Sequence, residues 1–307
     1  MKRGVAVKLL VYGAGVLGSL FSARLHEAGH DVSLLARGDR LAALRRHGVQ
    51  LAEGDSATVR RLPVPVVEHP DGGYDLTAVV VRAHQVDAVL ESLAGLDGDV
   101  LFLHNWAADA QPLGEVIGLE RVLLGFLTSG GTMDGDVVRY RASSLLTRLV
   151  PMPIGEPDGR TTPRLERIVR ELRTVGINAK AEPQMDAWLK THAAFEVPLG
   201  QAVHAAGGPV ALAGDPEAIR TMIRLMRQHL AALPNRPVPR GFDALRVLPH
   251  GLLVAVLRRF LRSSTVAHSG LNNTSHAETA ELARLAEQLG VLAGSEPEPP
   301  VGLRPGP

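Results

Sequence analysis

Six residues near the start of the chain have the glycine spacing of a dinucleotide-binding turn. The run GAGVLG, residues 13–18, fits the pattern G-x-G-x-x-G and separates an apolar run at residues 5–11 from a helically spaced segment at residues 16–28. Between a strand and a helix, such glycines permit a tight turn, a close approach of the backbone to pyrophosphate, and close helix packing. The positive end of the helix then binds phosphate. The cofactor-binding residues that this motif predicts are Gly13, Gly15, Val16, Leu17 and Gly18.

An arginine follows the second expected strand, residues 32–35, at the place that distinguishes NAD from NADP sites. NAD-preferring folds carry Asp or Glu there, about 20 residues after the glycines, to bind the ribose 2′-hydroxyl. This chain has Arg37, and a guanidinium pairs with a 2′-phosphate, so the sequence predicts NADP as the cofactor. Asp39 is evidence against this prediction, which a register error of one residue would weaken. A second interpretation leaves Arg37 and Arg40 as solvated loop charges.

The elements around this turn have the pattern of an α/β fold. Further buried strands are expected at residues 76–81, 100–104 and 122–126, separated by helical stretches such as residues 85–93. Strands that alternate with helices predict an N-terminal, Rossmann-type, doubly wound parallel sheet. Residues 137–141 and 145–150 are expected to form an antiparallel hairpin that extends this sheet.

Helical signals dominate the second half of the chain. An amphipathic helix is expected at residues 164–175, and further helices at residues 185–206, 216–233, 251–261 and 275–289. The expected domains are an NADP-binding Rossmann domain at residues 1–181, an all-helical substrate and catalytic domain at residues 182–294, and a Pro-rich disordered tail at residues 295–307.

The composition argues against several classes of function. The chain has 33 Lys and Arg against 32 Asp and Glu, which gives no electrostatic case for a nucleic-acid or anionic-membrane partner. It has no Cys, so disulfides, thiol nucleophiles and thiolate metal sites are excluded, and a cytoplasmic location is expected. No apolar run approaches the roughly 18 to 20 residues of a membrane span, and no His spacing indicates a metal site. The expected partner is a small-molecule substrate, and the sequence does not decide whether the chain forms a homodimer.

Several segments, in chain order, resemble the ketopantoate reductase (2-dehydropantoate 2-reductase) family. The matching segments are the first strand with GAGVLG, residues 28–38, VVVRAHQ at residues 79–85, Leu103-His104-Asn105, Trp188-Leu189-Lys190 and Arg262-Ser263-Ser264. The resemblance implies a two-domain reductase that transfers hydride from NADPH to a 2-oxo acid.

The resemblance also implies roles for single residues. Lys190 matches the lysine that protonates the ketone oxygen as hydride arrives, and a nearby cationic nicotinamide would depress its pKa. Asn105 matches an Asn beside the nicotinamide, at a strand end where ligands bind. Arg82, in the strand segment, is expected to contact the cofactor. Without the resemblance, Lys190 would be interpreted as a surface lysine and Asn105 as a turn residue.

Three positions depart from the family pattern. The family places Asn one turn after the lysine and again four residues later, where this chain has Ala194 and Pro198. It also places Glu about a dozen residues after its late serine, and counting from Ser264 leads to Ser275-His276. A site that lacks these hydrogen-bonding groups loses discrimination for a substrate hydroxyl, so we do not expect ketopantoate as the substrate.

Two histidines offer replacement polar groups. His276, with Glu278 nearby, is a second candidate catalytic residue, and His192 has the helical spacing to pair with Glu196. The alternative interpretation makes both histidines surface or helix-cap residues.

The leading hypothesis is an NADPH-dependent reductase with its active site in a cleft between two domains. Its substrate would be a 2-oxo acid, a ketone or an imine that is less polar than ketopantoate or has a different shape. The alternatives are an authentic 2-dehydropantoate 2-reductase with polar contacts from other residues, and a non-catalytic NADP-binding regulatory protein.

Overall fold

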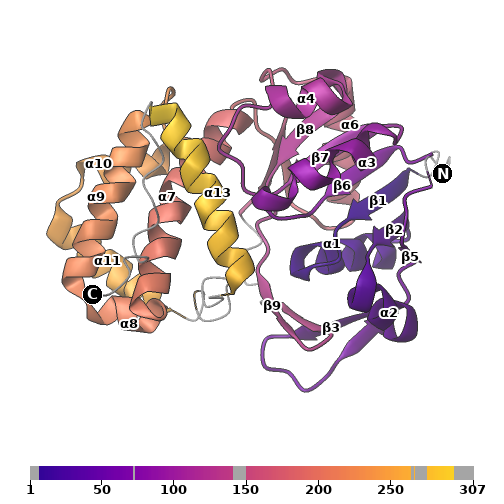
Figure 1. The fold of residues 1–307 in the computed structure, drawn as a ribbon, viewed down its shortest axis with the longest axis horizontal. Coiled ribbons are helices and arrows are strands. Elements are labelled where there is room, and N and C mark those ends of the chain that lie inside the picture. The colour runs from indigo at the N-terminus through magenta and orange to yellow at the C-terminus, as the bar shows by residue number, and fades with distance from the viewer. Residues whose placement is uncertain (1–6, 72, 141–149, 264–265, 267–274, 294–307) are drawn as a thin grey trace, which may run out of the picture. The chain divides into compact units, whose positions relative to one another are not determined.

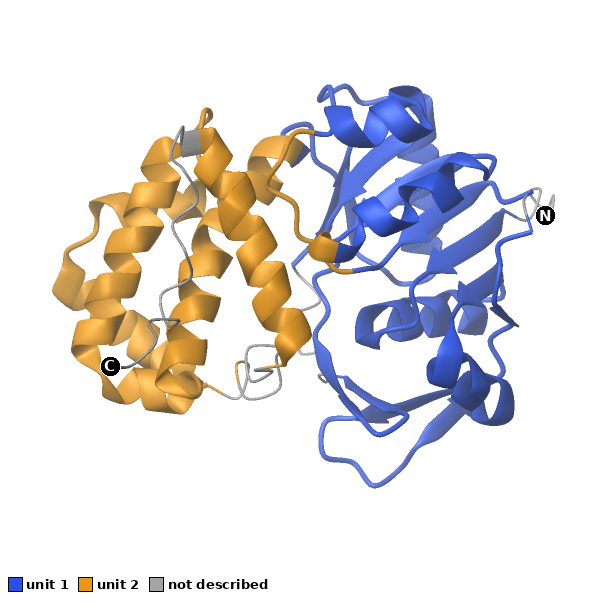
Figure 2. Ribbon diagram, in the orientation of Figure 1, with its two compact units in different colours: residues 1–81, 85–104, 110–185 blue, residues 82–84, 105–109, 186–307 orange. Residues whose placement is uncertain are grey.

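The structure is a computed structural model that describes residues 7–71, 73–140, 150–263, 266 and 275–293 (Figure 1). The chain divides into two compact units (Figure 2). Unit 1 holds residues 1–81, 85–104 and 110–185, and unit 2 holds residues 82–84, 105–109 and 186–307. The expected tail, most of the expected strand at residues 145–150, and Ser264 lie outside the described residues.

Unit 1 contains an eight-stranded sheet in the order β12-β11-β8-β7-β6-β1-β2-β5. All neighbouring strands are parallel except β8 and β11. The strands are β1 (Lys8–Tyr12), β2 (Asp31–Leu35), β5 (Val66–Val67), β6 (Leu76–Val79), β7 (Asp99–Leu103), β8 (Val122–Gly125), β11 (Met152–Gly155) and β12 (Ala179–Ala181). This parallel-dominated sheet with its helices confirms the predicted α/β class.

The helices of unit 1 follow the alternation expected from the sequence. They are α1 (Val16–Glu27), α2 (Gly38–His47), α3 (Leu90–Ala94), α4 (Gln111–Ile117) and α6 (Pro163–Thr174), with short 3₁₀ turns η1 (Ala83–Gln85, mostly in unit 2), η2 (Asp87–Val89) and η3 (Leu119–Arg121). Helices α1 and α6 pack on the sheet face that carries Leu9, Val11 and Leu101. Thr162 caps α6, because its hydroxyl accepts a hydrogen bond from the backbone N–H of Leu165.

The first βαβ unit places the candidate cofactor residues at one edge of the sheet. Strands β1 and β2 are parallel and in register, so that Tyr12, the last residue of β1, lies opposite Leu35, the last residue of β2. The glycine turn follows Tyr12, and Arg37 comes two residues after Leu35. Ligands of open α/β sheets bind at this carboxyl edge.

A second, four-stranded sheet corrects the expected hairpin. Its order is β4-β3-β10-β9, with β3 (Val49–Glu53), β4 (Arg60–Leu62), β9 (Gly131–Asp134) and β10 (Val137–Tyr140). Strand β10 does form an antiparallel hairpin, but with β9, and it pairs in parallel with β3 rather than with the main sheet. The prediction that this hairpin extends the main sheet was therefore wrong.

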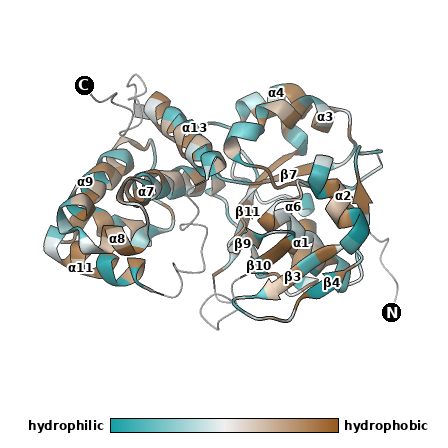
Figure 3. Cartoon of the chain, turned by 60° about the horizontal axis from the view of Figure 1, so that its bottom comes forward, coloured by the Kyte–Doolittle hydropathy of each residue, from teal (hydrophilic) through white to brown (hydrophobic). Residues whose placement is uncertain are grey.

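The described part of unit 2 from residue 186 onward is helical. Its helices are α7 (Met185–Ala206, which begins in unit 1), α8 (Pro209–Gly214), α9 (Pro216–Ala232), α10 (Asp243–Val247), α11 (His250–Leu261) and α13 (His276–Ala293), with the 3₁₀ turn η4 (Arg240–Phe242). Four of these were predicted from apolar spacing, and α9 shows the alternation of hydrophobic and hydrophilic residues (Figure 3). None of the helices in the described residues combines the length and hydrophobicity of a membrane-spanning segment.

Two short segments from the N-terminal half complete the core of unit 2. Ala83 and Ala107 are fully buried in one apolar cluster with residues of α7, α9 and α13. The members of this cluster on those helices are Ala193, Ala194, Val197, Leu230, Leu285 and Leu289. Residues 82–84 and 105–109 are therefore held by the packing of unit 2.

Candidate functional site

The glycine turn has the geometry of a phosphate-binding loop. Gly13 has a φ of 115°, and a Cβ there would lie 2.4 Å from the carbonyl oxygen of Val80. A Cβ on Gly18 would lie 1.8 Å from the carbonyl oxygen of Gly13. A Cβ on Gly15, by contrast, would have nothing within 4 Å. Gly13 and Gly18 are required by the fold, whereas Gly15 leaves open space at the N-terminus of α1.

This turn fits the pyrophosphate of a dinucleotide. Gly15 is the N-cap of α1, and Val16 and Leu17 form the first turn, half-buried against the core of unit 1. The first backbone N–H groups of a helix have no partner within the helix and carry a positive partial charge. A phosphate at the open face of Gly15 would accept hydrogen bonds from them.

Arg37 and Arg40 lie close in sequence but have different surroundings. Arg37 is exposed at the N-cap of α2, and its Nη2 donates a hydrogen bond of 2.9 Å to the hydroxyl of Tyr12. Arg40 donates from Nε to the carbonyl oxygen of Ala14 at 3.1 Å and from Nη2 to Ser19 Oγ at 3.1 Å. Arg40 is therefore bound to the glycine turn and is no solvated loop charge.

The exposed position of Arg37 after β2 suits a contact with a 2′-phosphate. Its side chain follows the strand whose end lies beside the end of β1, and it is joined to Tyr12 immediately before the glycine turn. Asp39, which would have favoured NAD, lies in the first turn of α2, where a carboxylate complements the positive end of the helix.

Lys190 lies on α7 in unit 2 and is held between two carboxylates. Its ammonium nitrogen lies 2.6 Å from Asp109 Oδ1 and 2.8 Å from Asp186 Oδ2, and only 5% of its side chain is exposed. Burial alone would lower the pKa of Lys190, but the two carboxylates outweigh it and raise the pKa above its ordinary value. The depressed pKa was expected beside a cationic nicotinamide and stays a prediction for that state, but neither carboxylate was foreseen.

Asn105 and His104 follow the carboxyl end of β7. The side-chain oxygen of Asn105 is buried and has no hydrogen-bond partner among the described residues. Such an atom is an acceptor that fits an N–H donor of a ligand, such as a carboxamide. His104 is buried, and burial lowers its pKa to about 3, so its imidazole is neutral at physiological pH.

Arg82 lies in unit 2, where it pairs with two carboxylates of α13. Its Nη1 lies 2.7 Å from Glu278 Oε2 and 2.5 Å from Glu281 Oε2. Burial raises the pKa of both carboxyl groups, although Arg82 acts in the opposite sense. The arginine expected at the cofactor is thus an internal ion-pair partner within unit 2.

The two candidate histidines are in different positions. His276 is the exposed first residue of α13, close enough to His84 for its charge to contribute to the lowered pKa of that residue, after burial and Arg82. His192 Nε2 lies 2.8 Å from Glu196 Oε2, as the helical spacing predicted, and its ring stacks on Trp188.

Two of the three departures from the family pattern fall on an apolar part of α7. Ala194 is fully buried in the cluster that joins α7 to α13, and Pro198 is an internal residue of the helix. Ser275 precedes α13, and Ser264 lies outside the described residues. The described residues contain no group of three or more His, Asp or Glu side chains that could hold a metal ion.

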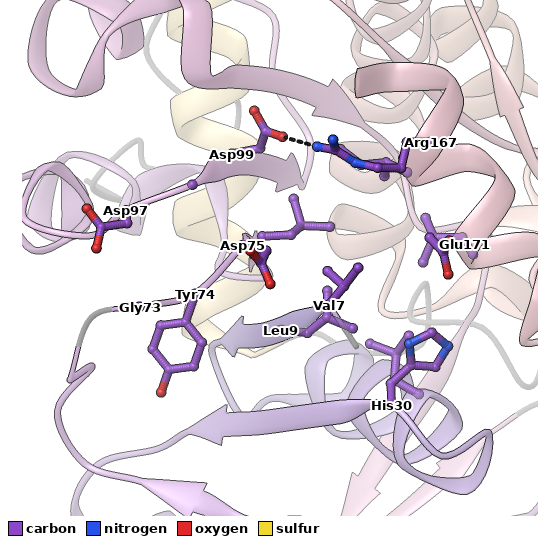
Figure 4. A pocket seen from close by; sticks show the side chains of 15 residues that line it. Val7, Leu9, His30, Gly73, Tyr74, Asp75, Asp97, Asp99, Arg167 and Glu171 are labelled. Carbon is purple, nitrogen blue, oxygen red and sulfur yellow. Dashed lines mark hydrogen bonds and ion pairs between the residues drawn. The ribbon is translucent and has the colours of Figure 1, made fainter. Parts of the chain in front are cut away.

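A cavity of about 540 Å³ in unit 1 lies at the opposite edge of the main sheet (Figure 4). Val7 precedes β1, Asp75 precedes β6, and Asp99 begins β7, so the cavity is at the amino ends of parallel strands. On its wall Arg167 pairs with Asp99 at 3.5 Å. None of the candidate site residues lines it.

Sequence reasoning missed three residues of the site. Asp109 and Asp186 bind Lys190, and Tyr12 binds Arg37. Asp186 could have been found, because it lies four residues before Lys190 on a predicted helix. Asp109 and Tyr12 carry no such local signal.

Comparisons with known proteins point to the ketopantoate reductases. The family model described as ketopantoate reductase PanE/ApbA matches residues 9–150. A curated 2-dehydropantoate 2-reductase of Archaeoglobus fulgidus is 32% identical over 176 residues, which are 57% of this chain and 55% of that protein. One of Mesorhizobium japonicum is 26% identical over 206 residues, 60% of this chain and 63% of that protein. The matched segments thus span less than two thirds of these relatives.

Solved structures extend the likeness of the fold to most of the chain. The 2-dehydropantoate 2-reductase of Geobacter metallireducens has a TM-score of 0.65 at 18% identity and covers 94% of this chain and 98% of its own. A ternary structure of D-mandelate dehydrogenase with NADH and anilino(oxo)acetate has a TM-score of 0.73 at 16% identity, with coverage of 94% and 93%. Residues 9–150 thus match the ketopantoate reductase family model, and the chain as a whole has a fold similar to that of a solved 2-dehydropantoate 2-reductase.

Proposed function

We propose that this protein binds NADPH and reduces the C=O or C=N group of a small molecule, a 2-oxo acid, a ketone or an imine other than ketopantoate. The observation that carries the proposal is Lys190, a buried ammonium held by two carboxylates on a helix that the family resemblance marks as catalytic.

The residues have distinct tasks in this proposal. Bound NADPH supplies the hydride. The open face of Gly15 and the N-terminus of α1 bind its pyrophosphate, Arg37 binds the 2′-phosphate, and Asn105 accepts a hydrogen bond at the nicotinamide end. Lys190 donates a proton from Nζ to the substrate oxygen or nitrogen, and the carbon of the same double bond receives the hydride.

Asp109 and Asp186 position the acid and keep it charged. Each accepts a hydrogen bond from the Lys190 ammonium, so Nζ enters the reaction protonated and in a fixed orientation. After the proton has left, the two carboxylates favour its return from solvent, because the ammonium is the form that they stabilise. Asp109 is well placed for this exchange, since 73% of its side chain is exposed.

The choice of NADPH rests on this chain's own residues. The solved structure of D-mandelate dehydrogenase is a complex with NADH, so the fold alone does not distinguish NADH from NADPH. Arg37 supports NADPH, because a guanidinium pairs with a 2′-phosphate and cannot accept a hydrogen bond from a 2′-hydroxyl.

The low polarity near residue 194 supports a substrate other than ketopantoate. By the resemblance, the positions of Ala194 and Pro198 should carry Asn side chains, and here Ala194 lies in an apolar cluster. Each lost hydrogen bond to a substrate hydroxyl costs about 1 to 3 kcal/mol, so two losses lower kcat/KM by roughly one to four orders of magnitude.

Oxidation of NADPH in the presence of a panel of carbonyl compounds and imines tests this function. We expect kcat/KM for ketopantoate below the usual enzyme range of about 10⁴ to 10⁸ M⁻¹s⁻¹, and a value within that range for another member of the panel. Efficient reduction of ketopantoate would show an authentic 2-dehydropantoate 2-reductase. NADPH binding without turnover of any member would favour a regulatory protein.

A further inference from the structure

The hydroxyl of Tyr12 joins three segments of unit 1 at the cofactor edge of the sheet. Tyr12 is the last residue of β1, is 2% exposed, and directly precedes Gly13. Arg37, after β2, donates to its oxygen at 2.9 Å, and the Tyr12 hydroxyl donates to Ser92 Oγ on α3 at 3.3 Å. None of these contacts is needed for binding pyrophosphate.

The donors and acceptors of these side chains fix the direction of the two hydrogen bonds. A guanidinium has only donors, so the oxygen of Tyr12 must accept from Arg37. The single hydroxyl proton of Tyr12 is then used toward Ser92, which leaves the oxygen lone pairs facing Arg37. The guanidinium carbon also lies 5.9 Å from the centroid of the Tyr12 ring, within range of a cation–π contact.

We propose that Tyr12 is a specificity-determining residue for the adenosine 2′-phosphate, because it orders Arg37 before the cofactor binds. This inference rests on the proposed use of NADPH. Arg37 is exposed, and an exposed arginine would otherwise have to be immobilised when the phosphate arrives. Tyr12 is anchored in the buried sheet, so it holds the guanidinium at a fixed place beside the glycine turn. Tyr12 is thus a positioning residue that need not touch the cofactor.

Dissociation constants for NADPH and NADH, measured by fluorescence titration of the full chain, test the role of Tyr12. In Tyr12→Phe we expect the preference for NADPH over NADH to fall by roughly three- to tenfold, with the Kd for NADH within about twofold of wild type. Ser92→Ala, which removes only the acceptor of the tyrosine proton, should give a smaller change in the same direction.

Tyr74→Phe is the matched control. Tyr74 is also 2% exposed in unit 1, and it shortly precedes β6, at the amino end of that strand. Loss of its hydroxyl should leave the cofactor preference unchanged. If Tyr12→Phe instead weakens NADPH and NADH equally, or leaves the preference at the wild-type value, the inference about Tyr12 is overturned.

A double substitution separates this inference from the proposed cofactor. Arg37→Ala should abolish the preference for NADPH, and Tyr12→Phe added to Arg37→Ala should cause no further loss. A merely structural role of Tyr12 would give additive effects. If the wild type binds NADH as tightly as NADPH, the assignment of NADPH fails, and if Arg37→Ala leaves an existing preference unchanged, the role of Arg37 at the 2′-phosphate fails. If Arg37→Ala abolishes it while Tyr12→Phe has no effect, only the role of Tyr12 fails.

Discussion

A single ammonium group carries the proposed chemistry. Lys190→Ala should leave the Kd for NADPH unchanged and lower kcat by about 10² to 10⁴, the usual contribution of a positioned general acid. Stopped-flow measurement of NADPH oxidation, with a separate titration of the cofactor, checks both parts. Lys180→Ala, which removes an exposed lysine of β12, should change neither value. Loss of cofactor affinity in Lys190→Ala would make Lys190 a cofactor contact instead.

The carboxylates around Lys190 predict the direction of a pH effect. The folded-state pKa of Lys190 is raised, so the protonated acid is present below that pKa and is lost as the pH rises through it. Asp186→Asn removes one stabilising charge and lowers this pKa. The fall of kcat on the alkaline side should therefore begin at a lower pH in Asp186→Asn than in wild type. An unchanged alkaline limb would show that Lys190 does not titrate in the reaction.

An added methyl group should affect two glycines of the same motif differently: at Gly15 it should weaken cofactor binding, and at Gly18 it should lower thermal stability. Gly15→Ala meets no atom within 4 Å, and the φ of −71° suits alanine, so the fold should keep its stability. The methyl group would occupy the space for pyrophosphate, and we expect at least a tenfold rise in the Kd for NADPH. Thermal unfolding and cofactor titration of the same samples provide the test. Wild-type affinity in Gly15→Ala would place the phosphates elsewhere.

Gly18→Ala is the counterpart, because the new Cβ would collide with the carbonyl oxygen of Gly13 at 1.8 Å. Either α1 or the turn must then move, so thermal stability should fall whether or not cofactor is present.

At the scale of elements, Arg40 joins α2 to the glycine turn and to the second sheet. Besides Ala14 and Ser19, it donates to the carbonyl oxygen of Asp136, between β9 and β10, at 3.1 Å. Arg40→Met should lower the free energy of unfolding by about 2 to 4 kcal/mol, since several charge-assisted hydrogen bonds are lost, and should weaken NADPH and NADH equally. Urea titrations and cofactor binding measure these effects. Arg46→Met, on the exposed side of α2, is the control, and equal losses in both variants would contradict the role of Arg40.

Local signals explain which elements could be predicted from the sequence. The β1-α1-β2 unit has an apolar run, a glycine turn and a helical spacing within about 30 residues, the usual size of such a unit, and its placement was correct. The partner of β10 could not be predicted, because β10 pairs with β3, which lies far back in the chain. The partners of Arg37 and Arg40 show the same limit, since only the folded chain separates a positioned guanidinium from a structural one.

At the scale of the whole chain, unit 2 includes residues that the linear sequence assigns to the sheet. Residues 82–84 and 105–109 belong to it, and they supply Arg82, Asn105 and Asp109. The family resemblance identified Arg82 and Asn105 as important but could not give their contacts. Glu278 and Glu281 lie almost 200 residues after Arg82, and no periodicity connects positions so far apart.

The pairing of Arg82 with α13 predicts how the stability of the chain depends on pH. Arg82→Met leaves Glu278 and Glu281 without their cation, and we expect a loss of roughly 2 to 4 kcal/mol at neutral pH, less than for a fully buried pair because 31% of Arg82 is exposed. Burial raises the folded-state pKa of both carboxyl groups, and the loss of Arg82 raises it further. Protonation therefore favours the folded variant, and its deficit relative to wild type should shrink as the pH falls from 7 toward the ordinary carboxyl range near about 4.3. Urea titrations at several pH values measure this deficit.

Adding Glu278→Gln and Glu281→Gln to Arg82→Met should restore part of the stability at neutral pH, because amides cost less to bury than unpaired carboxylates. A deficit that is the same at every pH would show that Arg82 stabilises unit 2 by packing alone.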